Sequence, residues 1–421
     1  MTPFNELRSE QLDIWDLRHP TRRQLLKGLL GAGALAAILV SAPIIANAAP
    51  TISGVSGSVD HGNTLTITGT GFGTKATAAP FMWDDMMGTP NSQAALTARG
   101  WDTVWPDAAP TSSSNMQYRA AGSPPAAHNH VTQYMRGIHQ SSGNFHTGQD
   151  VLASKQFTFS SGMAIYVSWY NYTGDGWTNV GSMSPADGNY KEFAYSNGAT
   201  VYDGTFWYES LYNGGLPPPP FATGLEAGTT TNSFILANAA DFYNTSNVYW
   251  GADSSVINPI GVWRKYEMKL LTGTNGYIRL LQNNVGPIIN YSGFFDRAPG
   301  TLRSIGVGGF ARACNSLNNS RYFNDVYIDM NPGTTNVPRV LLGNANTYAA
   351  STIVEPQIPS AWSDASITVK VNLGKHPNTG TAWLYVIRSD GSVNANGAPI
   401  TLGSGGADTS PPVAPSNLRV Q

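Results

Sequence analysis

The sequence has few of the residues that give a fold covalent or ionic support. It contains one cysteine, Cys314, in 421 residues, so no disulfide can form within the chain and core packing has to stabilise the fold. We expect Cys314 to be a small buried apolar residue rather than a nucleophile. Charged residues make up 12% of the chain and the formal net charge is -2. No lysine- or arginine-rich face lies beyond the N-terminus, so we expect no nucleic acid partner.

Residues that form turns and aromatic residues are abundant instead. The chain has 45 glycines and 27 prolines, and 11% of its residues are aromatic. This composition is typical of extracellular all-β proteins with many turns. The length leaves room for two or three domains.

Residues 1–48 have the features of an export signal. Thr21 to Lys27, TRRQLLK, matches the twin-arginine pattern, an apolar run follows, and Ala46-Asn47-Ala48 is a small-x-small cleavage site. The apolar stretch is barely long enough to span a bilayer, so we favour cleavage over a membrane anchor and expect no stable membrane span afterwards. The predicted location is extracellular, at the cell surface or periplasmic.

The stretch from Trp263 to Asn290 predicts consecutive antiparallel strands. From Lys265 to Leu270 charged and apolar residues alternate, which is the period of a half-buried strand. Thr272 to Gly276 is the expected turn, and alternation resumes from Tyr277. Such a hairpin cannot bury its apolar face alone, so it requires a facing sheet.

The sequence pattern of this hairpin resembles the late strands of concanavalin A-like lectin/glucanase jelly rolls. A tryptophan opens a "W..YE" strand, and Arg321 to Asp329, RYFNDVYID, is similar to the closing strand of those domains. The resemblance implies a jelly-roll sandwich over residues 79–338, and it speaks for fold more than for activity.

Two separated segments resemble one immunoglobulin-like domain of the IPT/TIG type. Residues 51–78 carry its "G..L.ITG.GFG" signature, and within residues 339–402 the sequence SAWSDASITVKV is similar to its middle strands. We therefore predict a single discontinuous sandwich interrupted by the jelly roll, with residues 403–421 as a Pro-rich tail. The alternative is two shortened units, but 28 residues cannot bury a core.

Aromatic residues are dense between Met163 and Asn213. Rings that face solvent beside amides and hydroxyls suit sugars, because the apolar faces of pyranoses stack on them. The alternative is that these rings fill the interior of the sandwich. The residues we select as ligand-binding candidates are Trp169, Tyr170, Tyr172, Trp177, Trp207 and Tyr208.

Four of the seven histidines fall close together, at positions 128, 130, 139 and 146. Jelly-roll polysaccharide lyases neutralise a uronate with Arg, Gln or His and remove a proton with His or Tyr. Gly137-Ile138-His139 loosely resembles the "Q-I-H" strand of one alginate lyase class, which implies Arg136, His139 and Tyr134 as catalytic candidates. The companion strands of that class are absent, and polar loop residues beside a groove are the alternative. No cysteine or glutamate lies near enough to favour zinc.

The remaining acidic residues define neither a hydrolase nor a metal site. The "E-x-D-x-x-E" strand of retaining glucanases is absent. Asp84, Asp85 and Asp325 could hold a structural calcium ion, and otherwise we expect no cofactor and assign no metal site.

The sequence thus predicts an all-β, carbohydrate-binding protein that is secreted or attached to a surface. Its partner would be a polysaccharide or a cell-surface glycan. A polysaccharide lyase or glycoside hydrolase is the first alternative, and a structural or adhesion protein with an exposed apolar patch is the second.

Overall fold

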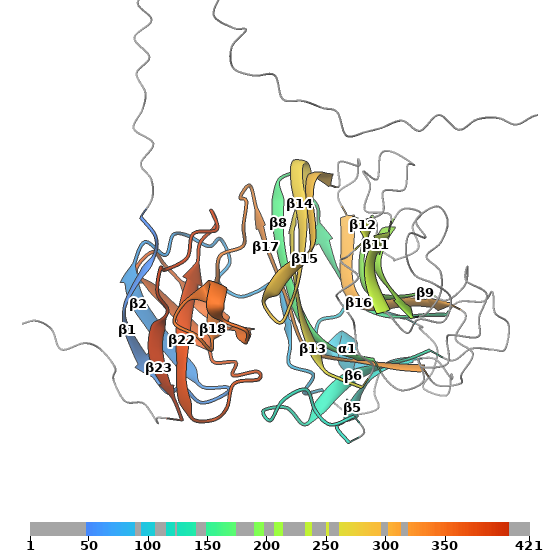
Figure 1. Ribbon diagram of the computed structural model, residues 1–421, viewed down its shortest axis with the longest axis horizontal. Coiled ribbons are helices and arrows are strands. Elements are labelled where there is room, and N and C mark those ends of the chain that lie inside the picture. Colours follow the sequence, from blue (N-terminus) through green and yellow to red (C-terminus); the bar gives the residue numbers. More distant parts are fainter. Residues whose placement is uncertain are drawn as a thin grey trace, which may run out of the picture. The chain divides into compact units, whose positions relative to one another are not determined.

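A computed structural model describes most of the chain after residue 47 (Figure 1). The described residues are 48–88, 94–105, 115–122, 124–139, 149–173, 189–197, 206–213, 232–237, 250–251, 261–295, 302–312 and 319–403. The predictions for the export signal, the Pro-rich tail, Cys314, Trp177 and His146 lie outside them.

Two four-stranded antiparallel sheets form an immunoglobulin-like sandwich from both ends of the described chain. The first sheet has the order β1 (Thr51–Gly57), β2 (Thr64–Thr70), β21 (Ser366–Lys370) and β20 (Ile358–Trp362). The second has the order β19 (Val354–Pro356), β18 (Arg339–Gly343), β22 (Gly380–Ile387) and β23 (Ala398–Leu402). A short 3-10 helix, η2 (Tyr348–Ala350), precedes β19.

Strands far apart in the sequence share the core of this sandwich. β2 pairs with β21 in a register that places Leu65 opposite Val369 and Ile67 opposite Ile367. All four side chains are buried in one hydrophobic cluster. The fold is therefore a discontinuous immunoglobulin-like sandwich, as the sequence predicted.

The intervening residues form a larger jelly-roll sandwich. Its first sheet has the order β15 (Val285–Phe295), β14 (Gly273–Gln282), β13 (Arg264–Leu271), β8 (Met163–Thr173), β17 (Asn319–Pro332), β6 (Gln133–His139) and β5 (Asn115–Ala120), with β3 (Met82–Asp84) also on β17. Its second sheet has the order β12 (Trp250–Gly251), β11 (Asn232–Ala237), β10 (Phe206–Asn213), β9 (Asn189–Asn197), β16 (Leu302–Arg312), β7 (Gln149–Thr158) and β4 (Thr103–Trp105). The short helix α1 (Ala94–Ala98) contributes Leu96 to the core. The all-β prediction is confirmed.

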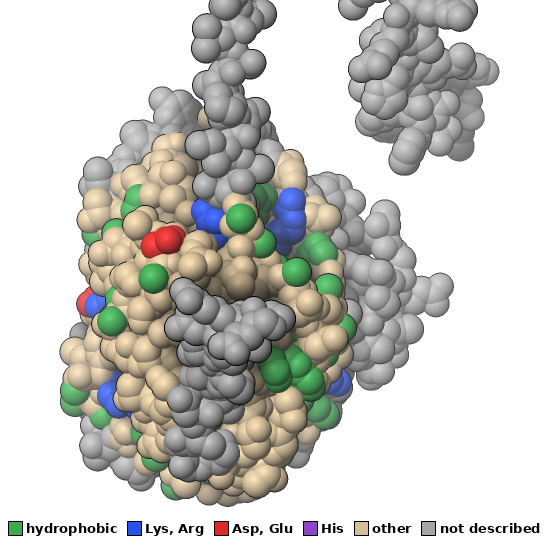
Figure 2. Space-filling view, turned by 90° about the vertical axis from the view of Figure 1, so that its left-hand side faces the viewer, with side chains coloured by type: hydrophobic (Ala, Val, Ile, Leu, Met, Phe, Trp, Pro, Cys, Tyr) green, Lys and Arg blue, Asp and Glu red, His purple; other side chains and the backbone are tan. Residues whose placement is uncertain are grey.

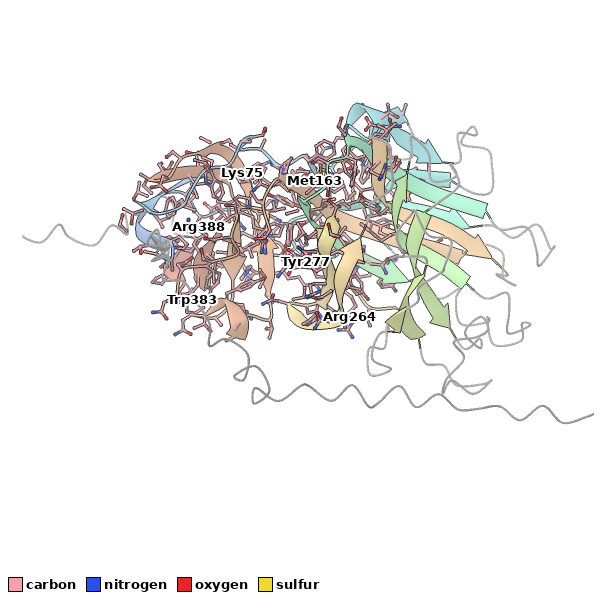
Figure 3. The ribbon with its side chains drawn as sticks, turned by 90° about the horizontal axis from the view of Figure 1, so that it is seen from above. Lys75, Met163, Arg264, Tyr277, Trp383 and Arg388 are labelled. Carbon is pink, nitrogen blue, oxygen red and sulfur yellow. The ribbon has the colours of Figure 1, made fainter. Side chains whose placement is uncertain are left out.

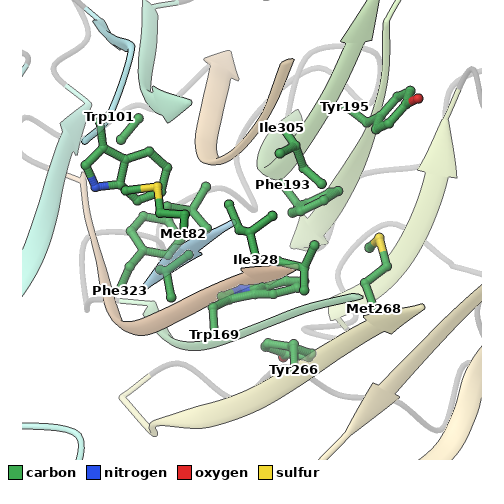
Figure 4. Packing of buried hydrophobic residues seen from close by; sticks show 14 of the residues in the cluster. Met82, Trp101, Trp169, Phe193, Tyr195, Tyr266, Met268, Ile305, Phe323 and Ile328 are labelled. Carbon is green, nitrogen blue, oxygen red and sulfur yellow. The ribbon is translucent and has the colours of Figure 1, made fainter. Parts of the chain in front are cut away.

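The two jelly-roll sheets meet over an aromatic core (Figure 4). The ring of Trp169 stacks on Phe193 at 5.3 Å between centroids and lies 5.6 Å from Tyr266. Met82 and Ile328 from the paired strands β3 and β17 join the same cluster. Each large side chain that is fully buried in this way stabilises the fold by about 1.5–3 kcal/mol.

Strand β13 corrects one expectation. Tyr266, Met268 and Leu270 face the core as the alternation predicts. However, the other face is not exposed to solvent, since Lys265 and Glu267 are 5% and 1% exposed. The charged face of β13 is buried because residues of the immunoglobulin-like sandwich bind it, as described below. The expected turn at Thr272–Gly276 is also shorter, since β14 already begins at Gly273.

The jelly roll begins and ends on neighbouring strands. β3 pairs with β17, with Trp83 opposite Tyr327. The carboxylate of Asp84 at the end of β3 is fully buried, and it accepts hydrogen bonds from Trp101 Nε1 at 2.7 Å and from the Tyr118 hydroxyl. Burial raises the pKa of Asp84 despite these donors. A guest domain with adjacent ends interrupts its host with little distortion.

The surface is sparsely charged, in keeping with the composition. Figure 2 shows one face with few charged side chains and scattered hydrophobic ones. In the described part of the chain, no helix has the length and apolar character needed to cross a membrane.

Ile67→Ala and Ile367→Ala are each expected to lower the free energy of unfolding of the immunoglobulin-like sandwich by about 2–5 kcal/mol, because each leaves a cavity in the core. The double variant should differ from the sum by about 0.5–3 kcal/mol, since the two side chains are neighbours. Urea denaturation followed by hydrogen exchange of residues 366–370 measures both quantities. Thr64→Ala, at an exposed position of β2, is the control. Strict additivity of the two core substitutions would contradict the shared core.

Candidate functional site

Four polar or aromatic side chains form a row across neighbouring strands of the larger sheet. The register places Gln117 of β5 opposite Arg136 of β6, Arg136 opposite Tyr322 of β17, and Tyr322 opposite Tyr172 of β8. Residues beside them in sequence, such as Met135 and Phe323, face the core, so the row lies on the outer face of the sheet. We call this row the Arg136 surface.

Arg136 is held in place without a carboxylate partner. Its Nε and Nη2 donate to Ser320 Oγ at 3.0 and 2.8 Å, and the guanidinium carbon lies 5.8 Å from the centre of the Tyr322 ring. The side chain is partly exposed. Within the described part of the chain, no acidic side chain forms an ion pair with it. A fixed, unneutralised guanidinium is suited to an anionic ligand.

Aromatic rings surround the tyrosines of the Arg136 surface. The Tyr322 ring lies 4.8 Å from Tyr134 and 5.5 Å from Tyr172, both in edge-on geometry. Trp263, which precedes β13, lies 5.5 Å from Tyr172, and its Nε1 donates to Pro125 O at 2.9 Å. Tyr172 is partly exposed, whereas Tyr134, Tyr322 and Trp263 are largely buried. Burial raises the pKa of Tyr134, so this hydroxyl stays protonated near neutral pH.

The sequence-predicted ligand rings are distributed differently from our expectation. Trp169 is completely buried in the core, and Tyr170 is 1% exposed, so neither ring can stack on a sugar. The alternation of β8 points Trp169 inward, and the immunoglobulin-like sandwich covers Tyr170. Among the candidates whose side chains are described, Tyr172 alone reaches the Arg136 surface. Trp207 and Tyr208 belong to β10, but their side chains lie outside the described part.

The lyase candidates are brought together in part. Tyr134 and Arg136 lie on the same face of β6, as the alternation predicted. His139 ends that strand, and its side chain is not among those described. Convergence of all three residues therefore stays a prediction.

Histidines gather where the two sandwiches meet. The four histidines with described side chains, His61, His128, His130 and His376, all lie there. The rings of His61 and His130 stack at 4.9 Å, and His130 Nε2 lies 3.1 Å from His376 O. The sequence grouped His128 with His130 but gave no reason to add His61 and His376, which lie in distant turns of the other sandwich.

A buried bulge fixes His128. Asp325 of β17 has a positive φ of 48° at a shift in register between β17 and β8. Its carboxylate lies 2.8 Å from His128 Nε2. Desolvation lowers the pKa of His128, but the charge and hydrogen bond of Asp325, together with the charge of Glu355, outweigh it and the pKa is raised. A bulge commonly redirects a side chain in this way.

Ion pairs buried from solvent join the two sandwiches. Lys265 of β13 lies 2.5 Å from Glu355 of β19, which also accepts a hydrogen bond from the hydroxyl of Tyr170. Lys75, labelled in Figure 3, pairs with Asp329 of β17 at 2.8 Å. All these charged groups are at most 6% exposed in their side chains. Removing one partner of such a pair leaves an unpaired buried charge, which is strongly destabilising.

The three aspartates considered for calcium do not form one site. Asp84 accepts from Trp101 and Tyr118, Asp85 pairs with Arg99, and Asp325 pairs with His128. Among the described residues, no group of three histidine, cysteine or acidic side chains is placed to hold a metal ion.

A separate cavity of about 330 Å³ opens beside β14. Hydroxyl and amide side chains line it, including Ser161, Thr272, Asn275 and Thr334. No charged or aromatic side chain lines it, so it lacks the groups that could form an ion pair with a ligand or stack on its ring, and we favour the Arg136 surface as the candidate site.

Comparison with known proteins does not assign this chain to a family. No family model and no curated protein matches the sequence. Among solved structures, the chain is similar to the endo-β-1,4-glucuronan lyase from the fungus Trichoderma reesei, with 9% identity, coverage of 59% of this chain and 95% of that one, and a TM-score of 0.41. The alginate lyase from Aplysia kurodai has 11% identity, 66% and 98% coverage, and a TM-score of 0.34. The binding domain of botulinum neurotoxin serotype G has 9% identity, 66% and 69% coverage, and a TM-score of 0.26. At these scores the likenesses support no argument about activity.

The contact between the sandwiches is expected to weaken in acid. Burial, with His130 nearby, lowers the pKa of His61 from 6.5 to about 4, and burial also lowers the pKa of His376. Both rings are therefore neutral when the sandwiches are in contact and bind protons more readily when they separate. The stability of the contact is complete above about pH 6.5 and falls as the pH drops toward 4.

Hydrogen exchange of residues 372–376, corrected for intrinsic rates, at pH 7 and pH 5 measures this effect. His61→Phe keeps a ring for stacking but cannot titrate, and it should reduce the pH dependence. His128 opposes the effect only in part, because Asp325, the main cause of its raised pKa, belongs to its own sandwich, while the smaller contribution of Glu355 comes from the other one. Equal protection at both pH values would contradict the expectation.

Proposed function

We propose that the protein binds an acidic polysaccharide at the Arg136 surface. The observation that supports this most is the unneutralised guanidinium of Arg136 in register with the rings of Tyr322 and Tyr172. A uronate residue presents a carboxylate beside an apolar ring face. The partly exposed guanidinium of Arg136 suits the carboxylate and the partly exposed ring of Tyr172 suits the ring face, whereas Tyr322 is 7% exposed and packs against the guanidinium.

The hydrogen bonds of Arg136 suit this role. Ser320 Oγ accepts hydrogen bonds from Nε and Nη2, which fixes the plane of the guanidinium. Arginine presents five donors in a rigid fork, so donors beyond these two remain for a carboxylate. Gln117 lies opposite Arg136 in the register but is only 6% exposed, so its amide belongs to the buried support of the Arg136 surface rather than to its open face.

Binding without turnover is the function that the described side chains support best. A lyase requires a base, and the raised pKa of Tyr134 disfavours its hydroxyl in that role. A glycoside hydrolase requires paired carboxylates, and the four residues of the Arg136 surface include none. The large hydrophobic residues exposed in the described part are four, Phe81, Met87, Val262 and Leu302, which is little apolar surface for an adhesion patch.

The location and the family likeness of the small sandwich belong to the same proposal. The twin-arginine pattern in residues 1–48 would place the mature protein outside the cytoplasm, where polysaccharides are found. The IPT/TIG signature of residues 51–78 suits a secreted or surface-attached protein.

Arg136→Ala is expected to weaken binding of a soluble polyuronate at least about tenfold, because a charge-assisted hydrogen bond contributes about 1.5–3 kcal/mol. Arg136→Lys should recover only part of the loss, since lysine lacks the planar fork. Titration calorimetry with a polyuronate and with a neutral glucan measures both effects.

Arg279→Ala is the matched control, because Arg279 also lies over a tyrosine ring, at 5.1 Å from Tyr277, but on β14. An equal loss in both arginine variants, or no polyuronate binding by the intact protein, would refute the proposal. Absorbance of unsaturated products during incubation would instead favour the lyase.

A further inference from the structure

The immunoglobulin-like sandwich directly contacts residues that lie next to the Arg136 surface on the outer face of the sheet. We propose that this sandwich is a positioning part of that surface, and that Glu355 is the positioning residue. The inference rests on the proposed function for its ligand, but its structural half can be tested without one.

Glu355 is fully buried and accepts hydrogen bonds from residues of both sandwiches. One carboxylate oxygen accepts from Lys265 Nζ at 2.5 Å, and the other accepts from the Tyr170 hydroxyl and from the backbone N–H of Lys375 at 3.2 Å. Gly374 has φ +49°, and a Cβ there would lie 2.1 Å from Glu355 Cδ. The turn at Gly374 therefore closes tightly over the carboxylate, and only glycine fits.

The first connection to the Arg136 surface runs through Tyr170. Its ring lies 5.6 Å from Lys265 Nζ and 5.1 Å from Lys375 Nζ, so two cations and the Glu355 carboxylate fix its position. Tyr170 packs in one buried cluster with Tyr134, Trp263 and Tyr322. Tyr322 is itself a member of the Arg136 surface.

The second connection runs through Lys375. Its Nζ donates to Trp263 O at 3.3 Å. The Trp263 ring lies 5.5 Å from Tyr172, the partly exposed ring of the Arg136 surface. Trp263 Nε1 also donates to Pro125 O, which ties the segment before β6 to the same support.

These contacts lie beside the Arg136 surface, on the same outer face of the sheet, because Tyr170 and Tyr172 are two residues apart on β8. Neutralising Glu355 would leave the buried ammonium of Lys265 without its carboxylate, and Tyr170 would lose the acceptor that orients it. The rings packed on Tyr170 would then lose their fixed positions, although none of them contacts Glu355.

Glu355→Gln and Lys375→Met in the full mature chain test the inference. Lys375→Met removes the bond to Trp263 O but keeps the backbone bond to Glu355, so it serves if Glu355→Gln does not fold. Lys75→Met is the matched control, because it breaks the other buried ion pair between the sandwiches, that with Asp329. We expect hydrogen exchange of residues 124–134 and 261–266 without ligand to speed up at least about fivefold in the two test variants only. Polyuronate affinity should fall by a similar factor.

The outcomes separate this inference from the proposed function. Unchanged exchange in folded test variants overturns the inference, and so does an equal change in Lys75→Met, which would indicate general loosening. Faster exchange with unchanged polyuronate affinity also overturns it. If the intact protein binds no polyuronate, the proposed function fails, and exchange alone decides whether Glu355 positions these residues.

Discussion

The buried pairing of Lys265 with Glu355 is the interaction on which the arrangement of the two sandwiches depends. A β-sheet of a sandwich usually has one face packed against the core and one face exposed to solvent. Here the outer face of β13 carries two nearly buried charged residues, Lys265 and Glu267. Such charges are costly unless partners satisfy them. Glu355 of β19 pairs with Lys265, and one oxygen of Glu267 accepts a hydrogen bond from Tyr166 of β8, while its other oxygen has no hydrogen-bond partner among the described residues. Charge complementarity, rather than an apolar seam, therefore fixes how the sandwiches meet at this point.

Much of the fold could be predicted from the sequence because its signals are local. The alternation from Lys265 to Leu270 assigned the core-facing side chains correctly, and the segments around Ile67 and Ile367 proved to share a core. What alternation cannot tell is whether a polar face meets water or another sandwich. The charged face of β13 looked exposed for this reason, and it is buried.

The candidate site was less predictable for the same reason. Alternation placed Tyr134 and Arg136 on one face. It could not show that both of the consecutive aromatic residues Trp169 and Tyr170 are buried, the first in the jelly-roll core and the second under the immunoglobulin-like sandwich. The row of Gln117, Arg136, Tyr322 and Tyr172 comes from four strands and depends on their register. His61 and His376 joined the other histidines through tertiary contacts that no spacing in the sequence encodes.

The interrupted host sandwich also has a consequence for biosynthesis. β2 and its partner β21 are separated by roughly 300 residues, so β2 leaves the ribosome on the order of tens of seconds before the strand that completes its sheet. During that interval one edge of the hairpin of β1 and β2 has no neighbour, and open edges invite pairing with other chains. The guest brings its own two ends side by side through β3 and β17, and this shortens the loop that the host must close. The nascent chain is thus most exposed to aggregation while the guest is still being synthesised.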